Sequence, residues 1–208
     1  MGKFNVKSKV EEVKKTLNES VDFSYRYFKR ESQVIGFIFL KSIIDPQLFS
    51  SAIYFPIQSS DGELTIDLLK NDLIKCVDIK EVKEEDIVKE ILDGRAILIT
   101  NFSGKILSID LLKFPTRAPT EPPTSPVIQG PREGFVEDMQ TNVTLLRRRL
   151  KTPNLVMDVV RIGSQTQTKV VVTYLKDIAN KKIVKEVKDK LSKIKVDGVL
   201  DSYNILFY

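Results

Sequence analysis

The chain has 208 residues, of which 42% are hydrophobic and 29% charged, so it is long enough for one large domain or two small ones, each with a buried core. Its 33 basic and 28 acidic residues give a formal charge of +5, a mild excess that fits an anionic partner without requiring one. One cysteine and no histidine exclude an internal disulfide, a Cys/His zinc site and Ser-His or Cys-His catalysis. We therefore expect neither a cofactor nor an enzyme.

Hydropathy gives no sign of a membrane span or a secretion signal. Residues 32–40, SQVIGFIFL, form one of the most apolar runs and number nine, whereas a transmembrane helix needs about 20. The length favours a buried strand. The N-terminus has no apolar core of the signal-peptide type.

The first half of the chain predicts a mixed α/β unit. Ser8 and Glu11 have the spacing of a capping box, which predicts a charged helix ending near Asn18. Residues 21–30 alternate and residues 33–40 are apolar throughout, as in two neighbouring strands. Further elements are expected in this order: a helix from Asp45-Pro46, a helix over 64–73, a strand over 74–82, a helix over 83–94 ending at Gly94, and a hairpin of 95–100 with 106–112.

A proline-rich segment follows this unit. Five prolines between Pro115 and Pro126 stiffen the backbone and remove donors for regular pairing. We predict two small mixed α/β subdomains, residues 1–113 and 130–208, joined by a proline-rich linker at 114–129.

The second subdomain is predicted to have the order helix, strand, strand, helix. In the first helix an apolar stripe recurs every three or four residues and ends before Pro153. Strands are expected over 155–163 and 166–175, and the last helix has Val184, Val187, Leu191 and Ile194 on one face. The stripe of the first helix comprises Phe135, Met139, Val143, Leu146 and Leu150.

Three consecutive arginines, Arg147, Arg148 and Arg149, close the first of these helices. Consecutive helical residues lie about 100° apart, so the three side chains fan out and cannot all bind one phosphate. The simplest interpretation is a solvated helix end whose charge suits the helix dipole. The alternatives are a contact with a protein or subunit through Arg147 or Arg149 and, third, nucleic acid.

Other candidate residues each have a plain structural interpretation as well. Arg132 and Glu133 either begin a helix or form an ion pair across a domain or subunit seam. Tyr25 and Tyr27 are either core residues or, with Arg132, the lining of a ligand pocket between the subdomains. Cys76 is expected in the core. The lysines from Lys181 to Lys195 are expected to be a solvated face or, alternatively, a surface for anionic lipid.

Several stretches resemble one family. VIQGPREGFVEDMQTNVTLLRRRLKTPNL, TKVVVTYLKDIAN and LDGRAILITNFSGKILSID are similar to the A subunit of GerA-type bacterial spore germinant receptors. The resemblance implies an N-terminal soluble region of two α/β subdomains that leads toward a helical membrane domain. The signature positions are Pro131, Arg132, Glu133, Gly134, Phe135, Asn142, Arg147, Arg148 and Arg149.

The same resemblance implies a place and partners. The receptor would lie in the spore inner membrane with this region on the spore-core side, together with B and C subunits and other A subunits. We expect a non-enzymatic module for receptor assembly and for transmitting the germination signal. The alternative is a module that binds a nutrient germinant. No nucleic-acid partner is expected.

Overall fold

The computed structural model describes residues 4–76, 78–113, 134–199 and 205. The predicted linker at 114–129 lies outside the described residues and stays a prediction, and so do Pro131, Arg132 and Glu133 of the signature. By its contacts the chain divides into two compact units. Unit 1 comprises Met1–Thr16 and Asp22–Pro153, and unit 2 comprises Leu17–Val21 and Asn154–Tyr208.

Unit 1 contains an antiparallel five-stranded sheet in the order β1-β2-β4-β5-β3. The predicted strand pair and hairpin are confirmed, but the strand expected over 74–82 begins only at Ile79. The amide of Ile74 donates to the carbonyl of Leu69 at 3.0 Å, so this residue still belongs to the preceding helical turn. The strands are β1 (Phe23–Arg30), β2 (Gln33–Leu40), β3 (Ile79–Val82), β4 (Arg95–Thr100) and β5 (Ile106–Asp110).

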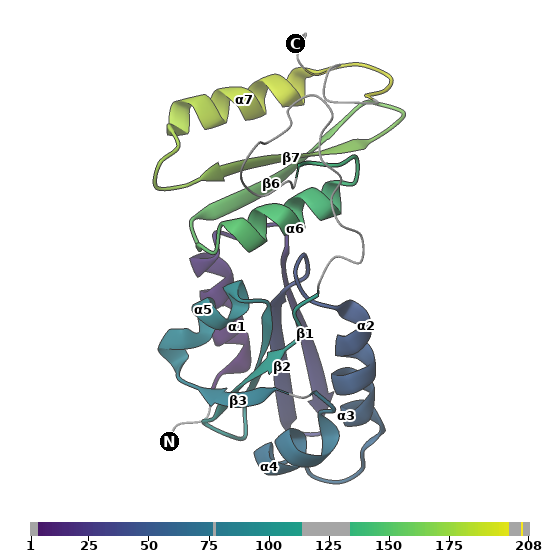
Figure 1. Ribbon diagram of the computed structural model, residues 1–208, viewed down its shortest axis with the longest axis vertical. Coiled ribbons are helices and arrows are strands. Elements are labelled where there is room, and N and C mark those ends of the chain that lie inside the picture. The colour runs from purple at the N-terminus through teal and green to yellow at the C-terminus, as the bar shows by residue number, and fades with distance from the viewer. Residues whose placement is uncertain (1–3, 77, 114–133, 200–204, 206–208) are drawn as a thin grey trace, which may run out of the picture. The chain divides into compact units, whose positions relative to one another are not determined.

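Helices cover both faces of this sheet (Figure 1). On one side lie α1 (Val6–Thr16) and α5 (Ile87–Leu92), and α5 is followed by Gly94 with a positive φ of 86°. The cap of α1 is Asn5 and not the predicted Ser8, since the Asn5 Oδ1 accepts from the Ser8 amide at 3.1 Å. The capping box was therefore placed about one turn too late.

The opposite face is covered by a run of short helices, α2 (Pro46–Phe49), α3 (Phe55–Ser59) and α4 (Ile66–Leu68), with π-helical turns at Ser50–Tyr54 and Leu69–Leu73. The Asp45 carboxylate caps α2 as predicted and accepts from the Gln47 amide at 2.8 Å. Strand β2 is buried along almost its whole length. Its continuous apolar run matches a strand that is covered on both sides.

Gly36 lies in β2 where α1 passes close to the sheet. A Cβ at this position would come within 2.5 Å of the Val6 Cγ1 atom. We expect Gly36→Ala to lower the free energy of unfolding by about 1–3 kcal/mol, the usual cost of overpacking a core. Urea titration measures it, and the cost should shrink when Val6 is also alanine. An equal cost in both backgrounds would contradict the close approach.

In its described residues, unit 2 has a two-stranded antiparallel sheet followed by a helix, which are the last three elements of the predicted order. The first helix of that order is not part of this unit. The elements are β6 (Leu155–Ile162), β7 (Thr168–Leu175) and α7 (Lys181–Lys193). The side chain of Asn180 caps α7 by accepting from the Lys182 amide at 2.9 Å. A small apolar core joins the strands to the helix, and its members are Ile162, Leu191 and Val199 with Val160, Val170, Val172, Ile194, Val196 and Ile205.

Among the described residues, no helix is both long and apolar enough to cross a membrane. The same residues contain no group of three or more His, Cys, Asp or Glu side chains suited to a metal ion.

Candidate functional site

The helix that carries the three arginines, α6 (Met139–Arg149), begins at an aspartate cap. The Asp138 Oδ2 atom accepts from the Thr141 amide and from its hydroxyl, both at 2.7 Å. These hydrogen bonds hold the pKa of the Asp138 carboxyl below its usual value. The cap places the start of α6 after Phe135, which the sequence pattern had included in the helix.

Asn142 fixes the segment that leads into α6. Its Oδ1 accepts from the Val136 amide at 2.8 Å, and its Nδ2 donates to the Val136 carbonyl at 2.7 Å. The neighbouring Phe135 is 67% exposed. The predicted stripe is therefore wrong at its ends, because Phe135 and Leu150 are exposed. Within it Val143 is buried, but the next buried leucine is Leu145 and not the predicted Leu146.

The Arg147 side chain is buried and only 1% exposed. Its Nε donates to the Asp22 Oδ2 at 2.8 Å and its Nη2 to the Asp22 Oδ1 at 3.0 Å. Asp22 precedes β1 and is equally buried. The guanidinium thus grips one carboxylate with two parallel hydrogen bonds, the strongest common geometry for such a pair.

A second hydrogen bond joins α6 to the same place. The Thr144 hydroxyl donates to the Ser42 carbonyl at 2.6 Å, and the Ser42 hydroxyl donates to the Asp22 Oδ2 at 2.8 Å. Thr144 and Arg147 are three residues apart and so lie on the same side of the helix. Together they attach α6 to the start of β1 and the end of β2.

These contacts correct two expectations. The sequence boundary assigned residues 130–153 to the second subdomain, but the bonds from α6 place this helix with unit 1. An interface role for Arg147 requires an accessible guanidinium, and this one is buried. Arg149 is exposed and Arg148 half-buried, in keeping with the expectation that the three side chains fan out.

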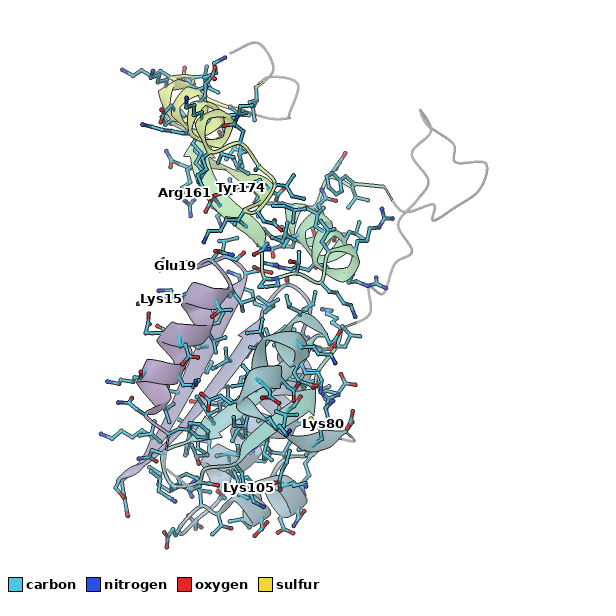
Figure 2. All side chains as sticks on the ribbon, turned by 90° about the vertical axis from the view of Figure 1, so that its left-hand side faces the viewer. Lys15, Glu19, Lys80, Lys105, Arg161 and Tyr174 are labelled. Carbon is cyan, nitrogen blue, oxygen red and sulfur yellow. The ribbon has the colours of Figure 1, made fainter. Side chains whose placement is uncertain are left out.

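A second charge cluster, with Arg95 and Glu90 buried at its centre, joins β3, β4 and β5 to α5, and sequence reasoning missed it. The Arg95 Nε lies 3.1 Å from the Glu90 Oε2 and donates to the Ser108 Oγ at 2.7 Å. The Lys80 Nζ, labelled on the sheet in Figure 2, lies 2.9 Å from the Glu90 Oε1. Because Glu90 belongs to α5, its contacts with Lys80 and Arg95 attach this helix to the sheet. The only sequence signal was a glutamate on an otherwise apolar helix face.

Tyr25 and Tyr27 point to the surface of unit 1 and not to its core. They are 40% and 36% exposed, with ring centroids 5.2 Å apart. The core interpretation of this pair is wrong. Arg132, their expected companion, lies outside the described residues. Cys76 packs against the core of unit 1 as predicted, and burial raises the pKa of its thiol.

The family described as Bacillus/Clostridium GerA spore germination protein matches residues 11–207. The chain is 35% identical over 173 residues to spore germination protein XA of Bacillus anthracis, which covers 83% of this chain and 34% of that protein. It is 28% identical over 200 residues to spore germination protein KA of Bacillus subtilis. This match covers 93% of this chain and 37% of that protein. The chain thus spans about a third of the length of these relatives.

The fold is similar to that of a solved structure, the N-terminal domain of the A subunit of the Bacillus megaterium spore germinant receptor GerK3. The TM-score is 0.67 at 24% sequence identity, and the match covers 95% of this chain and 75% of that chain. The mixed α/β fold expected from the sequence is therefore confirmed.

Proposed function

Because the chain belongs to the GerA family of spore germination proteins, we propose that it is the N-terminal region of a germinant-receptor A subunit and acts in receptor assembly and signal transmission. The similarity of its fold to the N-terminal domain of such a subunit supports the proposal.

The observation that carries the proposal is the exposed ring of Phe135 on a backbone that Asn142 holds by two hydrogen bonds. Large aromatic side chains are frequent energetic centres of protein interfaces. A ring on a fixed segment loses little conformational freedom on binding, which favours affinity. Phe135 therefore has the properties of an anchor for another protein.

The buried ion pair between Arg147 and Asp22 holds in place the helix that follows Phe135. Arg147 and Thr144 attach α6 to the sheet of unit 1, and a site held by packed elements keeps its geometry better than one on a free loop. Arg149 is exposed at the far end of the same helix. A partner that contacts both Phe135 and Arg149 would meet a preformed surface.

The partners in this proposal are other A subunits or the B and C subunits of one receptor in the spore inner membrane, with this region on the spore-core side. The role is assembly and signalling and not catalysis. Signalling requires a ligand that binds one arrangement of the receptor more tightly than another. In this proposal the contacts of this region with other subunits transmit the change in receptor arrangement that the ligand favours.

Replacing Phe135 by serine in the whole receptor tests the proposal. We expect the receptor to be lost from spore membranes or spores to germinate at least tenfold more slowly, while the isolated chain unfolds at an unchanged urea concentration. Phe55→Ser is the matched control, because Phe55 is 56% exposed on α3 of the same unit. Normal receptor levels and germination with Phe135→Ser, or equal defects in both variants, would contradict the proposal.

The alternative role, binding of a nutrient germinant, is favoured by one observation. Two exposed tyrosine rings 5.2 Å apart offer a platform for a small ligand. Titrating nutrient amino acids, sugars and nucleosides into the chain while NMR reports on Tyr25 and Tyr27 separates this role from assembly. Shifts at these rings would support it, and their absence would remove it.

A further inference from the structure

The outer surface of α7 in unit 2 is rich in lysine. Between Lys176 and Lys195 the sequence has eight lysines against three acidic residues, Asp177, Glu186 and Asp189, which leaves five positive charges, and it has no arginine. Figure 2 shows nitrogen-tipped side chains projecting from this helix. We call the exposed residues of 178–195 the α7 surface.

Most of these charges are not neutralised within the protein. Lys188 lies 2.5 Å from the Asp158 carboxylate and over the Tyr174 ring, so it belongs to the packing of α7 on the strands. Lys190 lies 3.5 Å from Glu186. In the described part of the chain no ion pair engages the exposed lysines Lys181, Lys182, Lys185 and Lys193.

The same surface exposes apolar side chains. Ile178, in the turn before α7, is 76% exposed, Ile183 is 59% exposed and Val187 is 39% exposed. Exposed isoleucines beside lysines are typical of helices that lie in a membrane interface, where the apolar groups enter the headgroup boundary and the ammonium groups stay at the phosphates.

The residue composition of the α7 surface favours a lipid bilayer over other anionic partners. Protein interfaces are depleted in lysine and enriched in arginine and aromatic residues, and the α7 surface has neither of the latter. Single-stranded nucleic acid is usually bound by stacking on aromatic rings and by arginine, and it gives no role to exposed isoleucines. We propose that the α7 surface binds an anionic lipid bilayer. This proposal does not depend on the function proposed above.

Sedimentation of the 208-residue chain with lipid vesicles tests the proposal. We expect binding to vesicles of equal parts phosphatidylglycerol and phosphatidylcholine, weakening as salt rises, and at least tenfold weaker binding to phosphatidylcholine alone. Each lysine near an anionic membrane contributes about fivefold in affinity. The triple variant Lys182→Glu, Lys185→Glu and Lys193→Glu should therefore bind at least about tenfold more weakly than the original chain.

The matched control reverses three exposed lysines of unit 1, Lys7, Lys15 and Lys29, and so changes the net charge equally. We expect it to keep most of the binding, whereas Ile178→Ser with Ile183→Ser should weaken it. Equal losses in the two lysine variants would overturn the proposal, because net charge alone would then explain the binding. Equal binding to both kinds of vesicle, or tighter binding to polyuridylate RNA than to vesicles, would also overturn it.

Discussion

Replacing Arg147 by methionine is expected to lower the free energy of unfolding by about 3–5 kcal/mol, the usual cost of removing one partner of a buried ion pair. The substitution leaves the Asp22 carboxylate buried without the two guanidinium hydrogen bonds, while the Ser42 hydroxyl at 2.8 Å still donates to it. Lysine should restore only part of the stability, because one ammonium group cannot form the two parallel bonds of the guanidinium.

The neighbouring arginine provides the control. Arg148 is only partly buried, so Arg148→Met should change stability far less, by about 1 kcal/mol or less. Urea unfolding followed by circular dichroism measures both variants. Similar losses at the two positions would mean that burial of the Arg147 side chain does not matter to stability.

Replacing Arg95 by methionine is expected to have the second largest effect, about 3 kcal/mol. This side chain bonds the Ser108 Oγ and the Asp78 Oδ2, both at 2.7 Å, and lies beside Glu90. The exposed Lys105, 3.0 Å from Glu81, is the control, because surface pairs contribute about 0–1 kcal/mol. If Arg95→Met lowers the free energy of unfolding no more than Lys105→Met does, the contacts of Arg95 do not form a stabilising buried network.

The same cluster predicts how stability depends on pH. Burial alone would raise the pKa of Glu90, but bonds from Lys80 and Ser108 and the nearby Arg95 lower it, and the Arg95 hydrogen bond lowers the pKa of Asp78. A lowered folded-state pKa stabilises the fold above the unfolded value of about 4, and this stability is lost as pH falls through the folded value. The urea concentration at the midpoint of unfolding should therefore decrease as the pH is lowered below about 4. This decrease should be less steep for the Arg95→Met variant.

Local patterns were sufficient for most elements of the fold. The alternation in β1, the apolar run of β2 and the turn between β4 and β5 depend on neighbours in sequence, so they could be predicted. The start of α1 was misplaced because Ser8 and Asn5 both suit a cap, and the choice depends on side-chain geometry.

The role of Arg147 was beyond sequence reasoning, because its partner Asp22 is 125 residues away. One signal was present. Arg147 follows Val143 by four residues and so lies on the apolar side of α6, where a charged residue needs a partner. The pattern could indicate that a partner exists but not which carboxylate it is, and hence not that α6 packs on unit 1.

Arg147, the first arginine of the triplet, holds α6 on the sheet of unit 1 through Asp22. A double-mutant cycle with Asp22→Asn and Arg147→Met measures this coupling directly. We predict a coupling free energy of at least about 1.5 kcal/mol, in the range found for close charge pairs. A value near zero would contradict the claim.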